Sequence, residues 1–156
     1  MSAPPQYLKL ACPPLTREEK QRVSEELTAA MARAHADVAR PERRRACVVH
    51  FCAFERDDLA IGGVLLSDLH RGYYLLEVSS VAPDQESKAL LAREITGALA
   101  RALDLGTSSL AQIHVVLRAV TADDVAVGGR LVSSLEPAPA PAPVTHPRLR
   151  RAPGAA

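Results

Sequence analysis

Two histidines lie inside apolar, β-branched stretches of the chain, each spaced so that it shares a strand face with another reactive side chain. His50 precedes Cys52 by two residues, and His114 precedes Arg118 by four. Side chains alternate between the two faces of a strand, so residues an even number of positions apart lie on the same face. An imidazole titrates near neutral pH and can act as general acid or base. A guanidinium can stabilise negative charge that develops on a substrate.

This spacing leads to a hypothesis for an active site. We predict that His114, Arg118 and Tyr73 form a polar cluster in an otherwise apolar pocket, which works by proton transfer or enol stabilisation. His114 would be the acid or base, and Arg118 would stabilise negative charge. The other candidates for binding residues are Pro5, Tyr7, His50, Cys52 and Phe54. In the alternative reading, His50 and His114 are hydrogen-bonded interface residues and Arg118 pairs with a carboxylate.

An internal repeat sets the framework for these residues. The segment 57–63, Asp-Asp-Leu-Ala-Ile-Gly-Gly, returns 66 positions later as Asp-Asp-Val-Ala-Val-Gly-Gly at 123–129. In the helical part of each unit the offset is 68, as Thr28 and Thr96 show. Identities at a fixed offset indicate a tandem duplication, and two units are too few for a solenoid. A closed two-unit domain is therefore expected.

Each unit reads as strand, helix, strand and hairpin. In the first unit we expect a strand over 6–12, a helix opened by a capping box at Thr16 and Glu19, a strand over 46–54 and a hairpin over 59–67. In the second we expect a strand over 73–81, a helix capped by Asp84, a strand over 110–120 and a hairpin at 128–129. The apolar stripes of the two helices are Val23, Leu27, Ala30, Met31 and Ala34, and Leu91, Ile95, Ala98, Leu99 and Ala102.

A β-α-β unit has parallel strands with the helix crossing one face, so the duplicated chain predicts an α+β fold with a four-stranded sheet and two helices on one side. The other face, which we expect to be rich in Val, Leu, Cys and Phe, would be bare, and this favours oligomerisation. The predicted divisions are a flexible N-terminus over 1–4, units over 5–70 and 71–135, and a disordered Pro/Ala/Arg tail over 136–156.

Composition narrows the function classes. A net charge of +1 gives no reason to expect nucleic acid as a partner, and no apolar run approaches the roughly 18 residues of a membrane span. The amino terminus has no pattern typical of a secretory signal, and the three cysteines contain no CxxC pair, so a cytoplasmic protein with reduced thiols is expected. Cys12 and Cys52 have no activating partner recognisable in the sequence and are expected to be buried. The Asp-Asp pairs at 57–58 and 123–124 indicate turn chemistry rather than a metal site.

The sequence resembles the tautomerase superfamily, in particular 4-oxalocrotonate tautomerase. The likeness rests on Leu-Thr-Arg-Glu-Glu-Lys at 15–20 and Ala-Ile-Gly-Gly-Val-Leu at 60–65, and on Asp-Gln-Glu-Ser-Lys at 84–88 and Ala-Val-Gly-Gly-Arg-Leu at 126–131. The two-unit length is similar to the cis-3-chloroacrylic acid dehalogenase and malonate semialdehyde decarboxylase branches. The resemblance implies a homotrimer that covers the bare face, a small-molecule substrate, and a pocket that opens where Tyr7 and Tyr73 begin their strands.

The chain departs from the family at its catalytic positions. The family uses an amino-terminal proline as base, but four residues precede Pro5, so its nitrogen is an amide, and Tyr73 begins the second unit. The family's carboxylate-binding arginines fall at Pro13–Pro14, Ala82–Pro83, Val48 and His114, and the dehalogenase-like pair falls near Ser80 and Pro83. A small dicarboxylate is therefore an unexpected substrate.

Three readings of the function remain. The first is an isomerase or lyase that performs tautomerisation or cyclisation of an apolar, biosynthetic intermediate without a cofactor or a metal. The second is a non-catalytic subunit of the same fold that binds a ligand or has a structural role. The third is a subunit active only beside a proline-bearing paralogue.

Overall fold

The computed structural model describes residues 6–35, 45–80 and 84–134. The first unit consists of β1 (Tyr7–Cys12), α1 (Arg17–Ala34), β2 (Val48–Ala53) and a hairpin of β3 (Ala60–Ile61) and β4 (Val64–Leu65). The second consists of β5 (Tyr74–Ser80), α3 (Gln85–Ala102), β6 (Ile113–Ala119) and a hairpin of β7 (Ala126–Val127) and β8 (Arg130–Leu131). The predicted order of elements is confirmed in both units.

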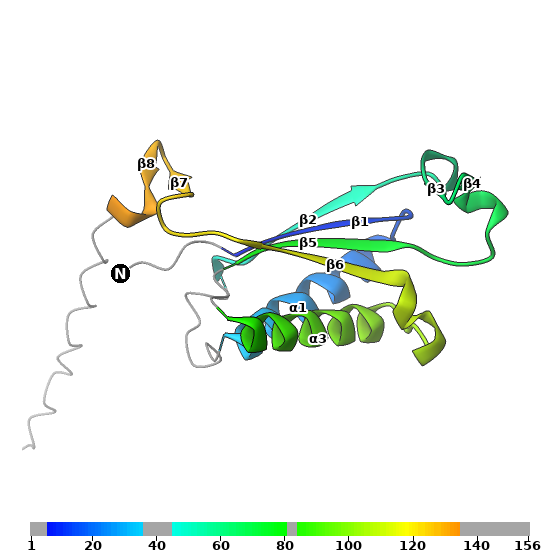
Figure 1. Cartoon of the computed structure of the whole chain (residues 1–156), viewed down its shortest axis with the longest axis horizontal. Coiled ribbons are helices and arrows are strands. Elements are labelled where there is room, and N and C mark those ends of the chain that lie inside the picture. Colours follow the sequence, from blue (N-terminus) through cyan, green and yellow to red (C-terminus); the bar gives the residue numbers. More distant parts are fainter. Residues whose placement is uncertain (1–5, 36–44, 81–83, 135–156) are drawn as a thin grey trace, which may run out of the picture.

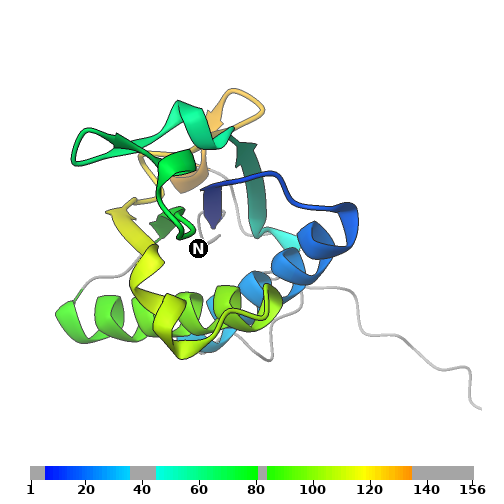
Figure 2. The same ribbon diagram turned by 90° about the vertical axis from the view of Figure 1, so that its right-hand side faces the viewer.

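Four strands form one sheet in the order β2-β1-β5-β6. The outer pairs β1–β2 and β5–β6 are parallel, and the central pair β1–β5 is antiparallel. Both helices cover one face of this sheet, as Figures 1 and 2 show. The α+β architecture predicted from the duplication is therefore confirmed, with each helix crossing over its own parallel strand pair.

The core lies between the sheet and the two helices. Leu8 and Leu10 of β1 and Leu76 and Val78 of β5 point into it and are fully buried. The predicted apolar stripes of the two helices pack against these side chains. Nine of the ten stripe residues are buried, and Ala34 is partly buried at the edge of the core. Burial of these side chains, at about 25 cal/mol per Å² of apolar surface, is the main favourable term for the fold.

An internal two-fold relation is visible in the packing of the helices. Arg33 of α1 pairs with Glu94 of α3 at 2.9 Å, and Arg101 of α3 pairs with Glu26 of α1 at 3.0 Å. Arg101 and Glu94 are the residues 68 positions after Arg33 and Glu26. The two ion pairs are thus equivalent contacts made in opposite directions, which is the geometry of two identical units packed together.

The twin hairpins repeat the same backbone turn. Gly62 and Gly128 both have φ of 60°, and the glycines after them have φ of 84° and 79°. Two successive residues in this left-handed region are characteristic of a type I′ turn, which favours glycine. The hairpins stand at opposite ends of the sheet, on the side away from the helices (Figure 1).

The second long strand of the second unit begins later than predicted. Residues 110–112 belong to η3, a 3-10 helix over Thr107–Gln112, so the strand predicted from residue 110 starts at Ile113. Gly106 precedes the helix in an extended conformation, and the amide of Ser109 donates to its carbonyl. The apolar pattern of Leu110 reads equally well as strand or helix, and the small polar residues before it favour the local turn.

The sheet face opposite the helices, called the open face below, is more polar than predicted. No element covers it within the part of the chain that the structure describes. Phe51 packs against the core instead, and the open face carries Tyr7, Lys9 and Ala11 of β1, Val48, His50 and Cys52 of β2, Leu75, Glu77 and Ser79 of β5, and His114, Val116 and Arg118 of β6. No helix among the described residues has the length and apolar character that a membrane span requires.

The capping box of α1 provides a test of the local sequence reading. The Thr16 hydroxyl accepts from the amide of Glu19, and the Glu19 carboxylate accepts from the amide of Thr16 at 2.7 Å. We expect Thr16→Ala to lower the free energy of unfolding by about 1 kcal/mol, because the cap bond is lost. Urea denaturation followed by circular dichroism measures the change. Ser108→Ala in η3 is the control, and an equal loss there would contradict the assignment.

Acid sensitivity is expected from the capped carboxylates. Hydrogen bonds from the amides of Thr16, Ser87 and Thr121 lower the pKa of Glu19, Asp84 and Asp124 respectively. A carboxyl whose pKa is lower in the folded state contributes stability above its unfolded pKa, and loses it as the pH falls through the folded value. We therefore expect the melting temperature to fall with acidification below pH about 4.

Asp84→Asn tests this expectation, because asparagine can cap a helix without a charge. The variant should lose less stability than the wild type between pH 5 and pH 2.5, in thermal unfolding followed by circular dichroism. Asp68→Asn, at a position that caps neither α-helix, is the matched control. An acid response of Asp84→Asn identical to that of the wild type would show that the cap charge does not contribute.

Candidate functional site

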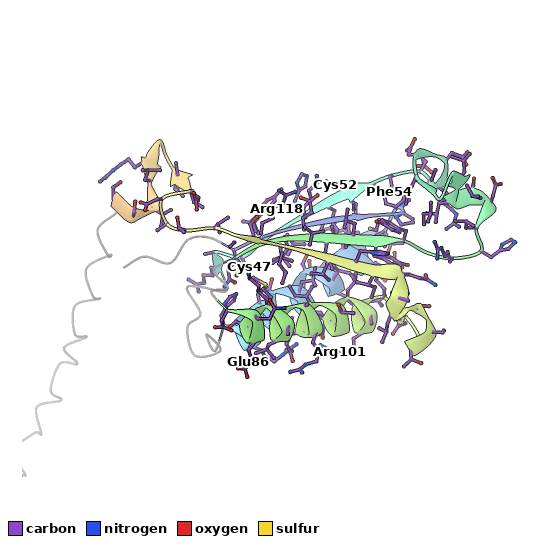
Figure 3. All side chains as sticks on the ribbon, viewed as in Figure 1. Cys47, Cys52, Phe54, Glu86, Arg101 and Arg118 are labelled. Atoms are coloured by element: carbon purple, nitrogen blue, oxygen red, sulfur yellow. The ribbon has the colours of Figure 1, made fainter. Side chains whose placement is uncertain are left out.

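The polar side chains that the sequence singles out gather on the open face. Tyr7, His50 and Cys52 lie on β1 and β2, and His114 and Arg118 lie on β6. Figure 3 shows Cys52 and Arg118 on the side of the sheet away from the helices, with Cys47 on the helix side. Phe54 follows the end of β2, half-buried, and its amide donates to the carbonyl of Cys12. Pro5 lies outside the described residues.

Tyr73 and His114 come together in the second unit. Their rings stack with centroids 4.7 Å apart and planes at 27°. The contact follows from the sheet register: Tyr74 is paired with Ile113, so His114 is one residue beyond the partner of Tyr74. Tyr73 is half-buried and His114 is exposed. The stack limits the orientations of the imidazole and leaves it accessible from the open face.

Arg118 has a different set of neighbours. Its guanidinium lies 3.4 Å from the carboxylate of Glu77 on β5. Four residues of strand separate it from His114, a distance of roughly 13 Å at the usual rise. Within one chain, therefore, the three residues predicted as one cluster divide into a Tyr73–His114 pair and a Glu77–Arg118 pair.

Lys9 and Glu77 occupy the centre of the open face. They are direct partners in the antiparallel β1–β5 register, and Glu77 is the residue 68 positions after Lys9. The internal two-fold axis therefore passes between them. Opposite charges facing each other across strands are favourable, whereas identical charged residues there would repel. In the β1–β5 register, Lys9 and Glu77 are the equivalent positions that face each other, and in this chain they carry opposite charges.

The first unit contains a second tyrosine–histidine pair, extended by a thiol. The Tyr7 hydroxyl lies 2.7 Å from Nδ1 of His50, and the Cys52 sulfur lies 3.8 Å from Nε2 of the same ring. Cys52 is half-buried, so the expectation that it is buried is wrong, and His50 is a neighbour of the thiol that the sequence reading did not identify. The sequence signal was the i, i+2 spacing of His50 and Cys52, which places both side chains on one strand face.

The other two cysteines have the environment of inert thiols. Cys12 is buried in the core, and its burial raises its pKa to about 11. Burial also raises the pKa of Cys47. A thiol reacts as a thiolate, so both residues are poor nucleophiles near neutral pH.

A groove lies on the helix side, away from all of these residues. Its volume is about 530 Å³, and it runs between α3 and the edge strand β6. The lining residues are Ala92, Arg93, Thr96, Gly97, Leu110, Ile113 and Val115. None of the predicted site residues contributes to it. Within the described residues no group of three or more His, Cys, Asp or Glu side chains could hold a metal ion.

Comparison with known proteins gives a sequence match and a set of structural matches. Residues 76–134 match the family model described as tautomerase enzyme. None of the curated proteins matches the chain by sequence. The structure of native fused 4-OT superposes with a TM-score of 0.69 at 18% identity, covering 83% of this chain and 98% of that one.

Two further structural matches come from other branches. N1, a member of the cis-3-chloroacrylic acid dehalogenase family, matches with a TM-score of 0.64 at 16% identity, over 80% of this chain and 82% of that one. FG41 malonate semialdehyde decarboxylase matches with 0.58 at 15%, over 78% and 88%. Other matched fused 4-OT structures are symmetric and asymmetric trimers.

These matches agree with the internal architecture. The second unit carries a tautomerase sequence, the first repeats its helix contacts and its hairpin turn, and the whole chain has the fold of the fused proteins. The second unit therefore matches the tautomerase family model by sequence, and the chain as a whole has the two-unit fold of the fused 4-OT proteins.

Proposed function

We propose that this protein is an isomerase- or lyase-type enzyme that moves a proton between the keto and enol forms of an apolar carbonyl compound. The observation that supports this most directly is the stack of Tyr73 on His114 at the start of the second unit. Fused proteins of the same fold include 4-OT, a dehalogenase-family member and a decarboxylase. The proposed step requires neither a metal nor an organic cofactor.

His114 would be the acid or base of this reaction. In the sequence four residues precede Pro5, so unless the chain is trimmed its nitrogen is an amide without a basic lone pair. An exposed imidazole can instead accept a proton from the carbon next to a carbonyl and return it to another position. Tyr73 would hold the ring through the stack, which limits the directions in which a nitrogen meets the substrate.

The surroundings of His114 favour an apolar substrate. Its partner in the β5 register is Leu75, and Val116, the next residue on the same face, is 41% exposed. Contact with an apolar ligand would remove these surfaces from water, a favourable change. Arg118 lies roughly 13 Å along the strand from His114. We propose that Arg118 stabilises charge on the same substrate. Because of this distance, the Arg118 that does so must come from a neighbouring copy of the chain.

A trimer is the assembly we propose. The open face is uncovered in one chain and displays Tyr7 at 38%, Val48 at 48% and Val116 at 41% exposure. Similar fused proteins are trimers. We propose that this association also brings His114 of one copy near Arg118 of another.

A non-catalytic ligand-binding subunit is the second candidate, and a subunit paired with a proline-bearing paralogue is its variant. The observation favouring both is the position of Pro5, which has no free amine in the intact chain. The mass of the mature protein tests this directly. A terminus at Ser2 leaves these readings open, whereas trimming to Pro5 would restore a proline amine and argue against both.

A relaxation assay tests the proposed reaction. A neutral aryl 1,3-diketone, whose enol absorbs in the ultraviolet, is diluted from organic solvent into buffer, and the approach to keto–enol equilibrium is followed with and without the protein. We expect acceleration by the wild type and a rate about 10²- to 10⁴-fold lower in His114→Gln, because general acid–base catalysis contributes that much.

His70→Gln is the matched control, since His70 is an exposed histidine in the segment before β5 and is not part of the proposed site. Its activity should equal that of the wild type. If His114→Gln keeps full activity, or if the wild type does not accelerate any of a series of apolar carbonyl compounds, the binding-subunit reading is preferred.

The assembly is tested by sedimentation equilibrium. We expect a species of three times the chain mass of 16.7 kDa at micromolar concentration. Val116→Lys should shift it toward the monomer, because it places a charge within the surface that association would bury. Val127→Lys, at a 54% exposed position on the β7 strand, is the comparison. A monomer in the wild type would contradict the trimer.

A further inference from the structure

We propose that Tyr7, His50 and Cys52 form a thiol-activating relay, through which Cys52 adds covalently to apolar α,β-unsaturated carbonyl compounds. The three side chains lie in a row on the open face, phenol to imidazole at 2.7 Å and imidazole to thiol at 3.8 Å. A nucleophile beside a base, which is itself held by a third group, is the general arrangement of nucleophilic catalysis. This site is separate from the Tyr73–His114 pair.

The internal repeat argues that this arrangement is not required by the fold. The positions equivalent to Tyr7, His50 and Cys52 in the second unit are Leu75, Val116 and Arg118. Leucine, valine and arginine occupy the same places in the same sheet. All three polar members of the row occur in the first unit alone, and they occur together.

One tautomer of His50 makes the row work as a relay. When Nδ1 carries the proton, it donates to the Tyr7 oxygen, and the lone pair of Nε2 faces the Cys52 sulfur. Proton transfer from the thiol then gives an imidazolium whose two N–H groups donate to Tyr7 and to the thiolate. Tyr7 is therefore a positioning residue, because its oxygen accepts from Nδ1 in this tautomer and stabilises the charged ring.

The surroundings of Cys52 are suited to a small apolar electrophile. Its partner across the strands is Ala11, whose single methyl group does not obstruct the thiol within one chain. Lys9 is the partner of His50, so a cation lies one step along the same face. A half-buried thiol beside a histidine is a usual setting of a reactive cysteine.

Conjugate addition fits this site better than acyl transfer. The backbone amides of β1 and β2 lie in the plane of the sheet, so they do not point toward an oxyanion formed above the thiol. In conjugate addition the negative charge develops instead on a carbonyl oxygen several bonds from sulfur. Lys9, the register partner of His50, is the residue to which we assign this stabilisation.

The proposed step balances without another reactant. The thiol proton of Cys52 moves to Nε2 of His50, and a sulfur electron pair forms a bond to the β-carbon of the substrate. The C=C π pair shifts toward the carbonyl and produces an enolate. The α-carbon then takes the proton from Nε2, so that S–H has been added across the double bond and the imidazole is neutral again.

Alkylation of the full-length native protein tests the proposal. N-ethylmaleimide and 2-cyclohexenone, a cyclic imide and a neutral enone, are the probes, and intact mass and peptide mapping give the rate at each cysteine. We expect one adduct per chain, at Cys52, with Cys12 and Cys47 unmodified until the protein unfolds. Reaction at Cys12 or Cys47 before Cys52, or no reaction in the native protein, would overturn the proposal.

Variants of His50 and Tyr7 distinguish a thiol that the relay activates from one that is only accessible. His50→Gln should slow alkylation of Cys52 by about 100-fold, the lower end of general-base effects, and Tyr7→Phe by a smaller factor. Added imidazole should restore the rate of His50→Ala and leave the wild type unchanged, a rescue that a structural role would not produce. His70→Gln is the control with wild-type rate.

Equal rates in the wild type, His50→Gln and Tyr7→Phe would overturn the relay. Circular dichroism verifies that each variant is folded, and the comparison of the three cysteines in the wild type requires no variant at all. The labelling does not use His114, so failure of the keto–enol assay leaves this test unaffected.

Discussion

The antiparallel pairing of β1 with β5 is the contact on which the rest of the structure depends. It joins two β-α-β units edge to edge, and it places both helices on the same face, where their apolar stripes cover the sheet. At its centre Lys9 faces its own equivalent, Glu77. Fusion of the two units allows this pair to be complementary, because the two copies of one position no longer have to be the same residue.

The same pairing divides the sheet into two faces with different constraints. Residues that face the helices must be apolar and of suitable volume, since close packing leaves little room for change. Residues on the open face are free of that requirement within one chain. This explains why the helical stripes are so similar in the two units, whereas Tyr7, His50 and Cys52 have become Leu75, Val116 and Arg118 in the second.

The sequence was sufficient to predict the fold because its signals are local and repeated. The Thr16 capping box, the paired glycines and the two offsets of 66 and 68 each point to the same β-α-β unit. The start of β6 was less predictable, since the apolar pattern at Leu110 fits a 3-10 turn as well as a strand. The polarity of the open face was harder to predict, because it depends on Lys9 and Glu77 of the two central strands facing the same side as His50 and Cys52.

The site was only partly predictable for a related reason. Alternation identifies which residues share a face of one strand, but contacts across strands depend on register, which the sequence does not contain. In both units the histidine lies on the neighbouring parallel strand, two residues beyond the position opposite the tyrosine. When the two units are aligned, the pair of the first unit lies two residues further along its strands than the pair of the second. That shift brings His50 next to Cys52 and leaves His114 four residues from Arg118. The duplicated sheet therefore contains two tyrosine–histidine pairs of similar geometry in different chemical surroundings, one beside a thiol and one beside apolar side chains.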